Sequence, residues 1–405
     1  MTTDTHPPAA TRYHDLDAVR ALALLLGVAL HGVMSFMAPR IWVIADRSTD
    51  VGLDVLFYVI HMFRMTTFFV LAGFFARMMM QKKGVASFVG NRLKRVGLPL
   101  VAFWPVAIAA IITFAILANM PAPGSAAASA PPPPPPTLAT FPLTHLWFLY
   151  VLLLLYAGAV VIKLATDVLH VGGFLGRALD KVVGILTKTD LITGVLMLPV
   201  FFAFYANPQW LMWMGILTPD AGFVPNMMAV AAFSTAFAFG WWLNRRADLL
   251  EHLAGRWFVY ALSAGLGTWL CVHMAGVEAK IVPVNGHDHP VYAALYALAG
   301  WSWTFALIGA ARAFLKRENP AIRYIADASY WIYLVHIPLV MGLQYAVMKL
   351  DWPAEPKFAI VLVGTLALAL VTYQLFVRYS FIGTILNGSK RKAKRGAAAA
   401  DEVTA

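Results

Sequence analysis

Long apolar runs, separated by short polar or basic segments, dominate the sequence. A helix needs about 20 apolar residues to cross the hydrocarbon core of a bilayer, and ten runs are of that order. The fifth run is the weakest, because Asn207 and Pro208 end it early. The pattern predicts an all-α fold, a polytopic membrane helix bundle with about ten transmembrane helices. These helices are expected near residues 17–38, 55–80, 97–119, 144–164, 189–206, 226–244, 257–275, 291–314, 327–349 and 357–380.

The basic residues predict which connections face the cytoplasm. With the N-terminus placed inside, most of the 31 Lys and Arg residues fall in the termini and in alternate connections, as the positive-inside rule requires. Adding or removing one helix would destroy this alternation, so both termini are predicted to be cytoplasmic. We expect a cytoplasmic N-terminal tail over 1–16, a transmembrane domain over 17–380 and a basic, disordered cytoplasmic tail over 381–405.

The composition indicates the same class of protein. The chain is 60% hydrophobic and 13% charged, with a mean hydropathy of +0.70, whereas soluble domains are about 25% charged. We assign the formal net charge of +11 to membrane topology and to contact with anionic headgroups of the lipid bilayer, so no nucleic-acid partner is predicted. A single cysteine, Cys271, excludes a disulfide framework and any Cys-ligated metal motif, and no metal site is predicted.

The first apolar run carries ionisable residues that a lipid-facing helix would avoid. Asp17 and Arg20 lie at its start, and His31 lies deep inside it. Arg20 and His31 are eleven residues apart, so they share a helix face at a separation of about 16.5 Å along the axis. Buried polar groups cost several kcal/mol unless they are paired, so His31 is a candidate functional residue. Arg20 alone also fits an anchor at the inner membrane surface.

The second run contains an arginine near mid-membrane. Arg64 lies ten residues in from Asp54, which places it about 15 Å deep. His61 precedes it by three residues and therefore shares its helix face. Both are candidate site residues, since an intramembrane cation needs a polar interior or a partner. The alternative for Arg64 is a structural clamp on carbonyl groups between helices.

Two further histidines are placed at membrane level. His145 opens the fourth run and either caps the same cavity or belongs to an interfacial belt. His336 lies near the middle of the ninth run, two residues before Pro338, so it either functions or binds a carbonyl freed by the proline. His31 and His61 are expected at similar depth, in the outer half of the membrane.

A basic cluster follows the second run. Arg92, Lys94 and Arg95 lie just inside the membrane, where a positive-inside anchor explains any such cluster. The planar guanidinium also binds phosphate in a bidentate manner. Arg92 and Arg95 are therefore candidates for binding an anionic cytosolic substrate.

These motifs together resemble the acyltransferase 3 family of membrane O-acyltransferases, and most of all its branch of glucan succinyltransferases. The resemblance covers nearly the whole chain. Arg20 and His31 match the family's Arg-x10-His motif, and Arg92 and Arg95 its cytoplasmic arginine motif. One departure is Ala72, where the family often has serine, so no hydroxyl role is carried over there. The matching segments are 15–20 with His31, 60–65, 68–75, 92–99, 145–149 and 330–336.

The resemblance implies a multi-pass protein of the cell inner membrane that moves an acyl group from cytosolic acyl-CoA to a hydroxyl of a periplasmic glucan or other surface carbohydrate. The branch favours succinyl, with acetyl as the alternative; acyl-CoA is a co-substrate and no bound cofactor is expected. A sugar hydroxyl needs a positioned base, and a histidine pKa near 6.5 suits that role.

Roles follow for the candidate residues. His31 is expected to accept the hydroxyl proton, while Arg64 or His61 stabilises the thioester oxyanion. Direct transfer and a transient acyl-histidine are both compatible with the sequence. The catalytic candidates are His31, His61, Arg64 and His336; the candidates for holding the phosphates of acyl-CoA are Arg20, Arg92 and Arg95; Asp17 and His145 are further candidates.

Two other classes of function compete with this interpretation. Ten helices with ionisable groups near the midplane also suit a transporter or flippase of a glycan or acyl-linked substrate. Against it, matching halves with Gly- or Pro-broken helices are not evident, and acidic residues within the runs are few. A scaffold protein would leave Arg64 and the buried histidines unexplained.

Overall fold

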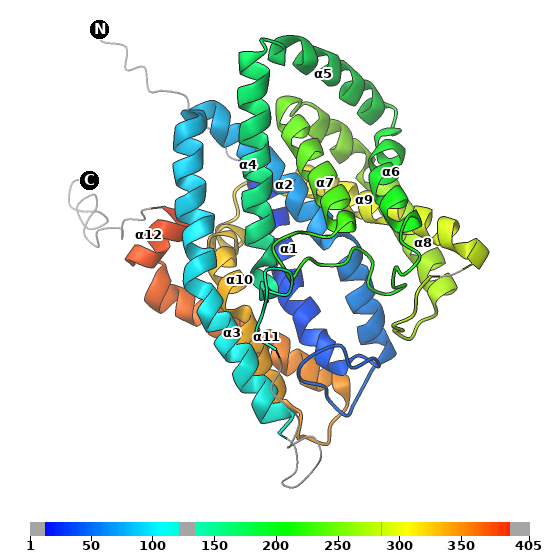
Figure 1. Ribbon diagram of the computed structural model, residues 1–405, viewed down its shortest axis with the longest axis vertical. Helices are drawn as coiled ribbons and strands as arrows, with labels where there is room; N and C mark the ends of the chain where they lie inside the picture. The colour runs from blue at the N-terminus through cyan, green and yellow to red at the C-terminus, as the bar shows by residue number, and fades with distance from the viewer. Residues whose placement is uncertain (1–12, 121–133, 285, 389–405) are drawn as a thin grey trace, which may run out of the picture.

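The computed structural model describes residues 13–120, 134–284 and 286–388, and these residues form an all-helical bundle (Figure 1). The predicted fold class is thus confirmed. The helices are α1 (His14–Val33), α2 (Val51–Arg92), α3 (Leu98–Ala118), α4 (Trp147–Val168), α5 (Gly172–Lys188), α6 (Ile192–Tyr205), α7 (Met227–Arg245), α8 (Leu249–Ala275), α9 (His289–Phe314), α10 (Pro320–Val347), α11 (Ala354–Thr372) and α12 (Phe381–Asn387). Short 3-10 turns are η1 (Met34–Phe36), η4 (Thr144–Leu146) and η5 (Gly286–Asp288), and π-helical turns are η2 (Leu93–Gly97) and η6 (Tyr373–Val377).

Within the described ranges, eight helical stretches are long and apolar enough to cross a membrane, or nine if the bent pair α5 and α6 forms one span. The difference from ten spans has a local cause. The second and third predicted runs join into one helical stretch, Val51–Ala118, which counts once. Its break lies at Gly84, where φ is +78°, a conformation that glycine adopts without a steric penalty. The sidedness of the termini stays a prediction.

Helix α5 was not anticipated by the hydropathy pattern. Figure 1 shows it across one end of the bundle, between α4 and α6, and it meets α6 at an angle of 102°. Its buried face is made of small residues. A Cβ at Gly176 would lie within 3 Å of the guanidinium of Arg245, and a Cβ at Gly184 would lie within 3 Å of that of Arg246. Its exposed residues include large apolar side chains such as Phe174 and Ile185 together with the cations Arg177 and Lys181, a mixture typical of helices that lie in a membrane interface.

Helices extend beyond both predicted limits of the transmembrane domain, while the domain boundaries themselves stay a prediction. Helix α1 begins at His14, three residues before the expected start at 17. The C-terminal tail expected to be disordered from 381 instead starts with α12, whose first turn is capped by the hydroxyl of Ser380 accepting from the backbone N–H of Ile382. Leu386 of α12 is buried in the core, which explains why this segment is ordered. Residues 1–12 and 389–405 lie outside the described residues.

Helix α1 is central, and it contacts α2, α9, α10 and α11. Helix α2 is held against α7 at backbone distance. A Cβ at Gly73 would lie 2.0 Å from the carbonyl oxygen of Phe237, and one at Gly240 would lie 1.8 Å from that of Val70. Small residues permit this approach between membrane helices. It fixes the position of α2, which carries the candidate site residues His61, Arg64 and Arg92.

Two long loops are folded onto the same end of the bundle. Loop 206–226 is bound to neighbouring segments through the backbone, with Leu143 donating to the carbonyl of Asp220 at 2.8 Å and Met212 to that of Val282 at 3.0 Å. Loop 37–50 is fixed by a buried ion pair, in which Lys357 of α11 lies 2.8 Å from Asp46 with both side chains 1% exposed. Both loops contribute to the cavity described next.

Candidate active site

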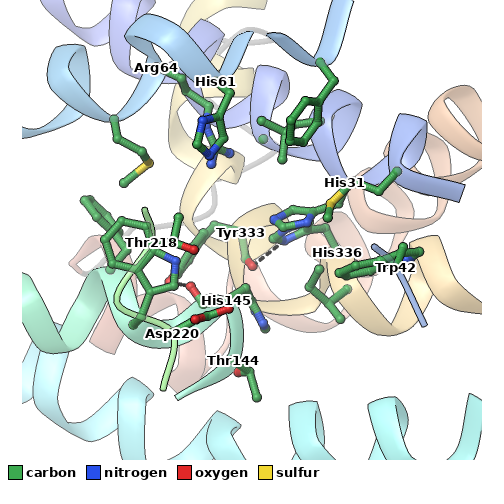
Figure 2. Close-up of a pocket in the computed structure, with 18 of the residues that line it drawn as sticks. His31, Trp42, His61, Arg64, Thr144, His145, Thr218, Asp220, Tyr333 and His336 are labelled. Atoms are coloured by element: carbon green, nitrogen blue, oxygen red, sulfur yellow. Dashed lines mark hydrogen bonds between the residues drawn. The ribbon is translucent and has the colours of Figure 1, made fainter. Parts of the chain in front are cut away.

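A cavity of about 350 Å³ lies between α1, α2, α10 and the start of α4, beneath the two loops. The structure brings five predicted residues together in it. His31 comes from α1, His61 and Arg64 from α2, His145 from η4 and His336 from α10 (Figure 2). The other lining residues with a polar side-chain atom are Trp42, Thr144, Trp147, Thr218, Asp220 and Tyr333.

Three of the imidazoles form a group. The ring centroids of His31 and His336 lie 5.2 Å apart, and those of His336 and His145 lie 5.0 Å apart. Each ring leaves at least one buried nitrogen without a hydrogen-bond partner. Within the described ranges, no group of three His, Cys, Asp or Glu side chains is arranged to hold a metal ion. The group therefore offers proton acceptors and donors to a molecule in the cavity.

One hydrogen bond fixes the tautomer of His336. Its Nδ1 lies 2.6 Å from the carbonyl oxygen of Tyr333, shown by the dashed line in Figure 2. A carbonyl oxygen only accepts, so Nδ1 carries the proton and the neutral ring presents Nε2 as a lone-pair acceptor. Nε2 is buried and has no partner. Tyr333 in turn donates its hydroxyl proton to the carbonyl of His145 at 2.8 Å, which joins α10 to η4.

Arg64 is 9% exposed, and no described carboxylate lies within ion-pair distance of it. Its Nε is buried without a hydrogen-bond partner. The guanidinium lies against Gly27 of α1, where an added Cβ would be 2.5 Å from Nη1. His61, one turn earlier, stacks on Phe57 with ring centroids 5.3 Å apart. Arg64 is thus a buried cation that faces the cavity.

The position of His31 depends on two residues that the sequence did not single out. Gln344 of α10 donates to the carbonyl oxygens of His31 at 2.9 Å and of Gly32 at 3.2 Å. Its own carbonyl accepts from the indole of Trp42 at 2.9 Å, and that indole lies 5.5 Å from the ring of His31. Carbonyls in the last turn of a helix lack helical partners, so Gln344 satisfies them and holds the His31 end of α1. In the sequence, the only indication of this role was that Gln344 is a single amide side chain within an apolar run.

Replacing Gln344 with leucine is expected to lower the free energy of unfolding by about 1–3 kcal/mol, because buried donors and acceptors lose their partners. Denaturant titration of the purified protein in detergent measures the change. Gln209→Leu is the control, since Gln209 is exposed in a loop. Equal unfolding free energies for the two variants would show that this bridge contributes nothing.

The remaining predicted residues lie outside the cavity lining. Arg20 forms an ion pair with Asp17 at 3.0 Å and lies over the ring of Phe75. Arg92 lies over the rings of Phe88 and Tyr156, 5.2 Å from each centroid. The backbone carbonyl of Arg95 accepts from the Tyr330 hydroxyl at 2.5 Å. Tyr330 and His336 both belong to α10, so this helix connects the arginine motif to the cavity.

Loop 206–226 adds polar lining residues that no motif indicated. Asp220 is accessible from the cavity, and partial burial of its carboxyl raises its pKa above the ordinary value. Thr218 lies two residues before it in the same loop. Their position follows from the backbone pairing of this loop with distant segments, which local sequence does not reveal.

Comparison with known proteins gives a consistent result. The model of the family Acyl_transf_3, described as acyltransferase domain, matches residues 13–374. The chain is 21% identical over 386 residues to Glucans biosynthesis protein C of Escherichia coli strain K12, which covers 95% of this chain and 96% of that protein. The same values hold for Glucans biosynthesis protein C of Escherichia coli strain SMS-3-5. No solved structure matches the chain.

Proposed function

The chain belongs to this acyltransferase family and is an acyltransferase, and we propose that it moves an acyl group from cytosolic acyl-CoA to a hydroxyl of a periplasmic glucan or another surface carbohydrate. The family match bears out the resemblance predicted from the motifs. The chain is a multi-pass membrane protein by its apolar helices, and we place it in the cell inner membrane. The glucan acceptor is suggested by the names of the relatives.

One observation carries the proposal. Ionisable side chains from α1, α2, η4 and α10 converge on one cavity in an otherwise apolar bundle. Such a site supplies a base beside polar groups that can stabilise developing charge. It also gives the buried histidines and Arg64 a role that simple packing does not.

In the proposed transfer, His31 is the general base. The sugar hydroxyl oxygen attacks the thioester carbonyl carbon, the C–S bond breaks and an ester C–O bond forms. His31 accepts the hydroxyl proton, which passes to the CoA thiolate, so the products are the O-acylated carbohydrate and free CoA thiol. His336 lies beside His31 with an unprotonated Nε2 and assists this proton transfer. His61 or Arg64 stabilises the oxyanion. His145 helps to hold the cavity wall in place, because its carbonyl accepts a hydrogen bond from the Tyr333 hydroxyl.

The donor is proposed to enter from the end of the bundle that carries Arg20, Arg92 and Arg95. Their guanidinium groups suit the phosphates of CoA. Arg20 and His31 are separated by about 16.5 Å along α1. The pantetheine arm would extend along that helix and bring the thioester to His31.

The experiment is turnover of labelled acyl-CoA by the purified protein in detergent or vesicles, with and without periplasmic glucan. Glucan-dependent release of CoA and label on the glucan support the proposal. Movement of a glycan across vesicles without CoA release would identify a transporter or flippase instead.

A double substitution tests the donor site. Arg92→Gln with Arg95→Gln is expected to raise the KM for acyl-CoA by on the order of tenfold to 100-fold with a smaller change in kcat, because charge-assisted contacts to phosphate are lost. Steady-state kinetics over a range of acyl-CoA concentrations measure it. The control is Lys94→Gln, an exposed cation between them. An unchanged KM in the double variant would exclude this part of the chain from donor binding.

A further inference from the structure

The charges that line the cavity do not balance locally. Arg64 is its permanent cation, and Asp220 is the carboxylate among its lining residues. Figure 2 shows the two on different sides of the cavity, with Thr218, Tyr333 and His145 between them. No ion pair joins Arg64 to a described carboxylate. A buried guanidinium without a partner is costly, and an anion placed in the cavity would remove that cost.

The wall of α1 is shaped around this guanidinium. Gly27 leaves the space that Nη1 of Arg64 occupies, since a Cβ there would approach to 2.5 Å. His31 follows Gly27 by four residues and therefore lies on the same face of α1, about 6 Å further along the axis. An anion held by Arg64 is thus about one helical turn from the proposed base.

That spacing fits a four-carbon diacid. A succinyl group has two carboxyl carbons separated by three C–C bonds, a span of about 4 Å at about 1.5 Å per bond. With its free carboxylate on Arg64, its thioester carbonyl reaches the His31 end of the cavity. An acetyl or butyryl group has no charge to offer and would leave the guanidinium unpaired.

We propose that Arg64 is the receptor for a free carboxylate on the acyl group, and that it selects dicarboxylic acyl donors such as succinyl-CoA over neutral donors. This inference rests on the proposed use of acyl-CoA as donor, and it specifies the class of acyl group that the donor carries. It assigns oxyanion stabilisation to His61, because Arg64 is occupied by the carboxylate throughout the reaction.

The test compares succinyl-CoA with butyryl-CoA, which has the same chain length and a methyl group in place of the carboxylate. The unaltered protein is expected to prefer succinyl-CoA in kcat/KM. Arg64→Gln is expected to reduce that preference by on the order of 100-fold, and Arg64→Lys by less, because the charge is kept. Equal losses with both donors would overturn the proposal and indicate that Arg64 acts on the oxyanion.

A second pair of variants moves the guanidinium without removing it. Gly27→Ala inserts a methyl group at the Arg64 contact and is expected to reduce the preference for succinyl-CoA. Gly158→Ala in α4 is the matched control, because a Cβ there meets nothing within 4 Å. A preference that survives in Gly27→Ala at the level of Gly158→Ala would contradict the proposed geometry.

A binding measurement separates this inference from the proposed function. Monomethyl succinate is expected to raise the thermal unfolding midpoint of the unaltered protein, and methyl butyrate is not. The shift should vanish in Arg64→Gln, whose folding is checked by its own unfolding transition. If no acyl-CoA is turned over yet monomethyl succinate still binds through Arg64, the proposed function fails and the carboxylate site stands. If the two esters act alike, the carboxylate site fails.

Discussion

Replacing His31 with alanine is expected to lower kcat for acyl transfer by about 100-fold to 10 000-fold, the usual contribution of a positioned general base. The sugar hydroxyl would then have to lose its proton to a more distant group. His336, at 5.2 Å between ring centroids, retains its unpartnered Nε2 and accounts for residual turnover. The measurement is release of CoA thiol from acyl-CoA in the presence of glucan.

The matched control is His273→Ala. His273 is also a helical histidine beside a tryptophan, but it is exposed on α8 and lies outside the cavity lining. It is expected to turn over substrate at the unaltered rate. Turnover above half of normal in a folded His31→Ala protein would remove His31 from the role of base and direct attention to His336.

The largest expected effect on stability comes from the ion pair that anchors loop 37–50. Lys357→Met leaves the carboxylate of Asp46 buried without its cation and is expected to lower the free energy of unfolding by about 3–5 kcal/mol. Both side chains are 1% exposed, so water cannot replace the lost partner. Denaturant titration in detergent measures the loss.

A double-variant cycle tests whether the lost ion pair causes the loss of stability in Lys357→Met. Adding Asp46→Asn to Lys357→Met removes the unpaired buried charge and should restore much of the stability. Together with Asp46→Asn alone, these variants give a coupling energy for the pair. Lys349→Met is the single control, because Lys349 is exposed in the connection between α10 and α11. A loss in Lys357→Met no larger than in Lys349→Met would show that the ion pair contributes little.

The parts of the structure that sequence predicts are those with a local signal. Apolar runs of span length identified the membrane helices, and His31, Arg64 and His336 stood out because each interrupts such a run. Their distances from the helix ends predicted similar depths for His31 and His61, and both residues line the cavity. Helix periodicity was enough to predict that His61 and Arg64 lie together, because residues three apart on a helix share a face.

The missed features depend on contacts between distant segments. Gln344 binds a loop residue 302 positions away, and Lys357 pairs with a residue 311 positions away. Neither partner has a pattern that identifies the other. Helix α5 was missed for another reason: its apolar residues are spaced around one face, so no continuous run appears in the sequence.

The separation in sequence between α1 and α10 has a consequence for biogenesis. His31 enters the membrane early in synthesis, whereas His336 and Tyr333 are made some 300 residues later. Until α10 is inserted, the first two helices carry polar groups into lipid without the helix that completes their surroundings. The cavity is therefore complete only after α10 has been inserted, and a chain that stops before α10 lacks the helix that supplies Tyr333 and His336.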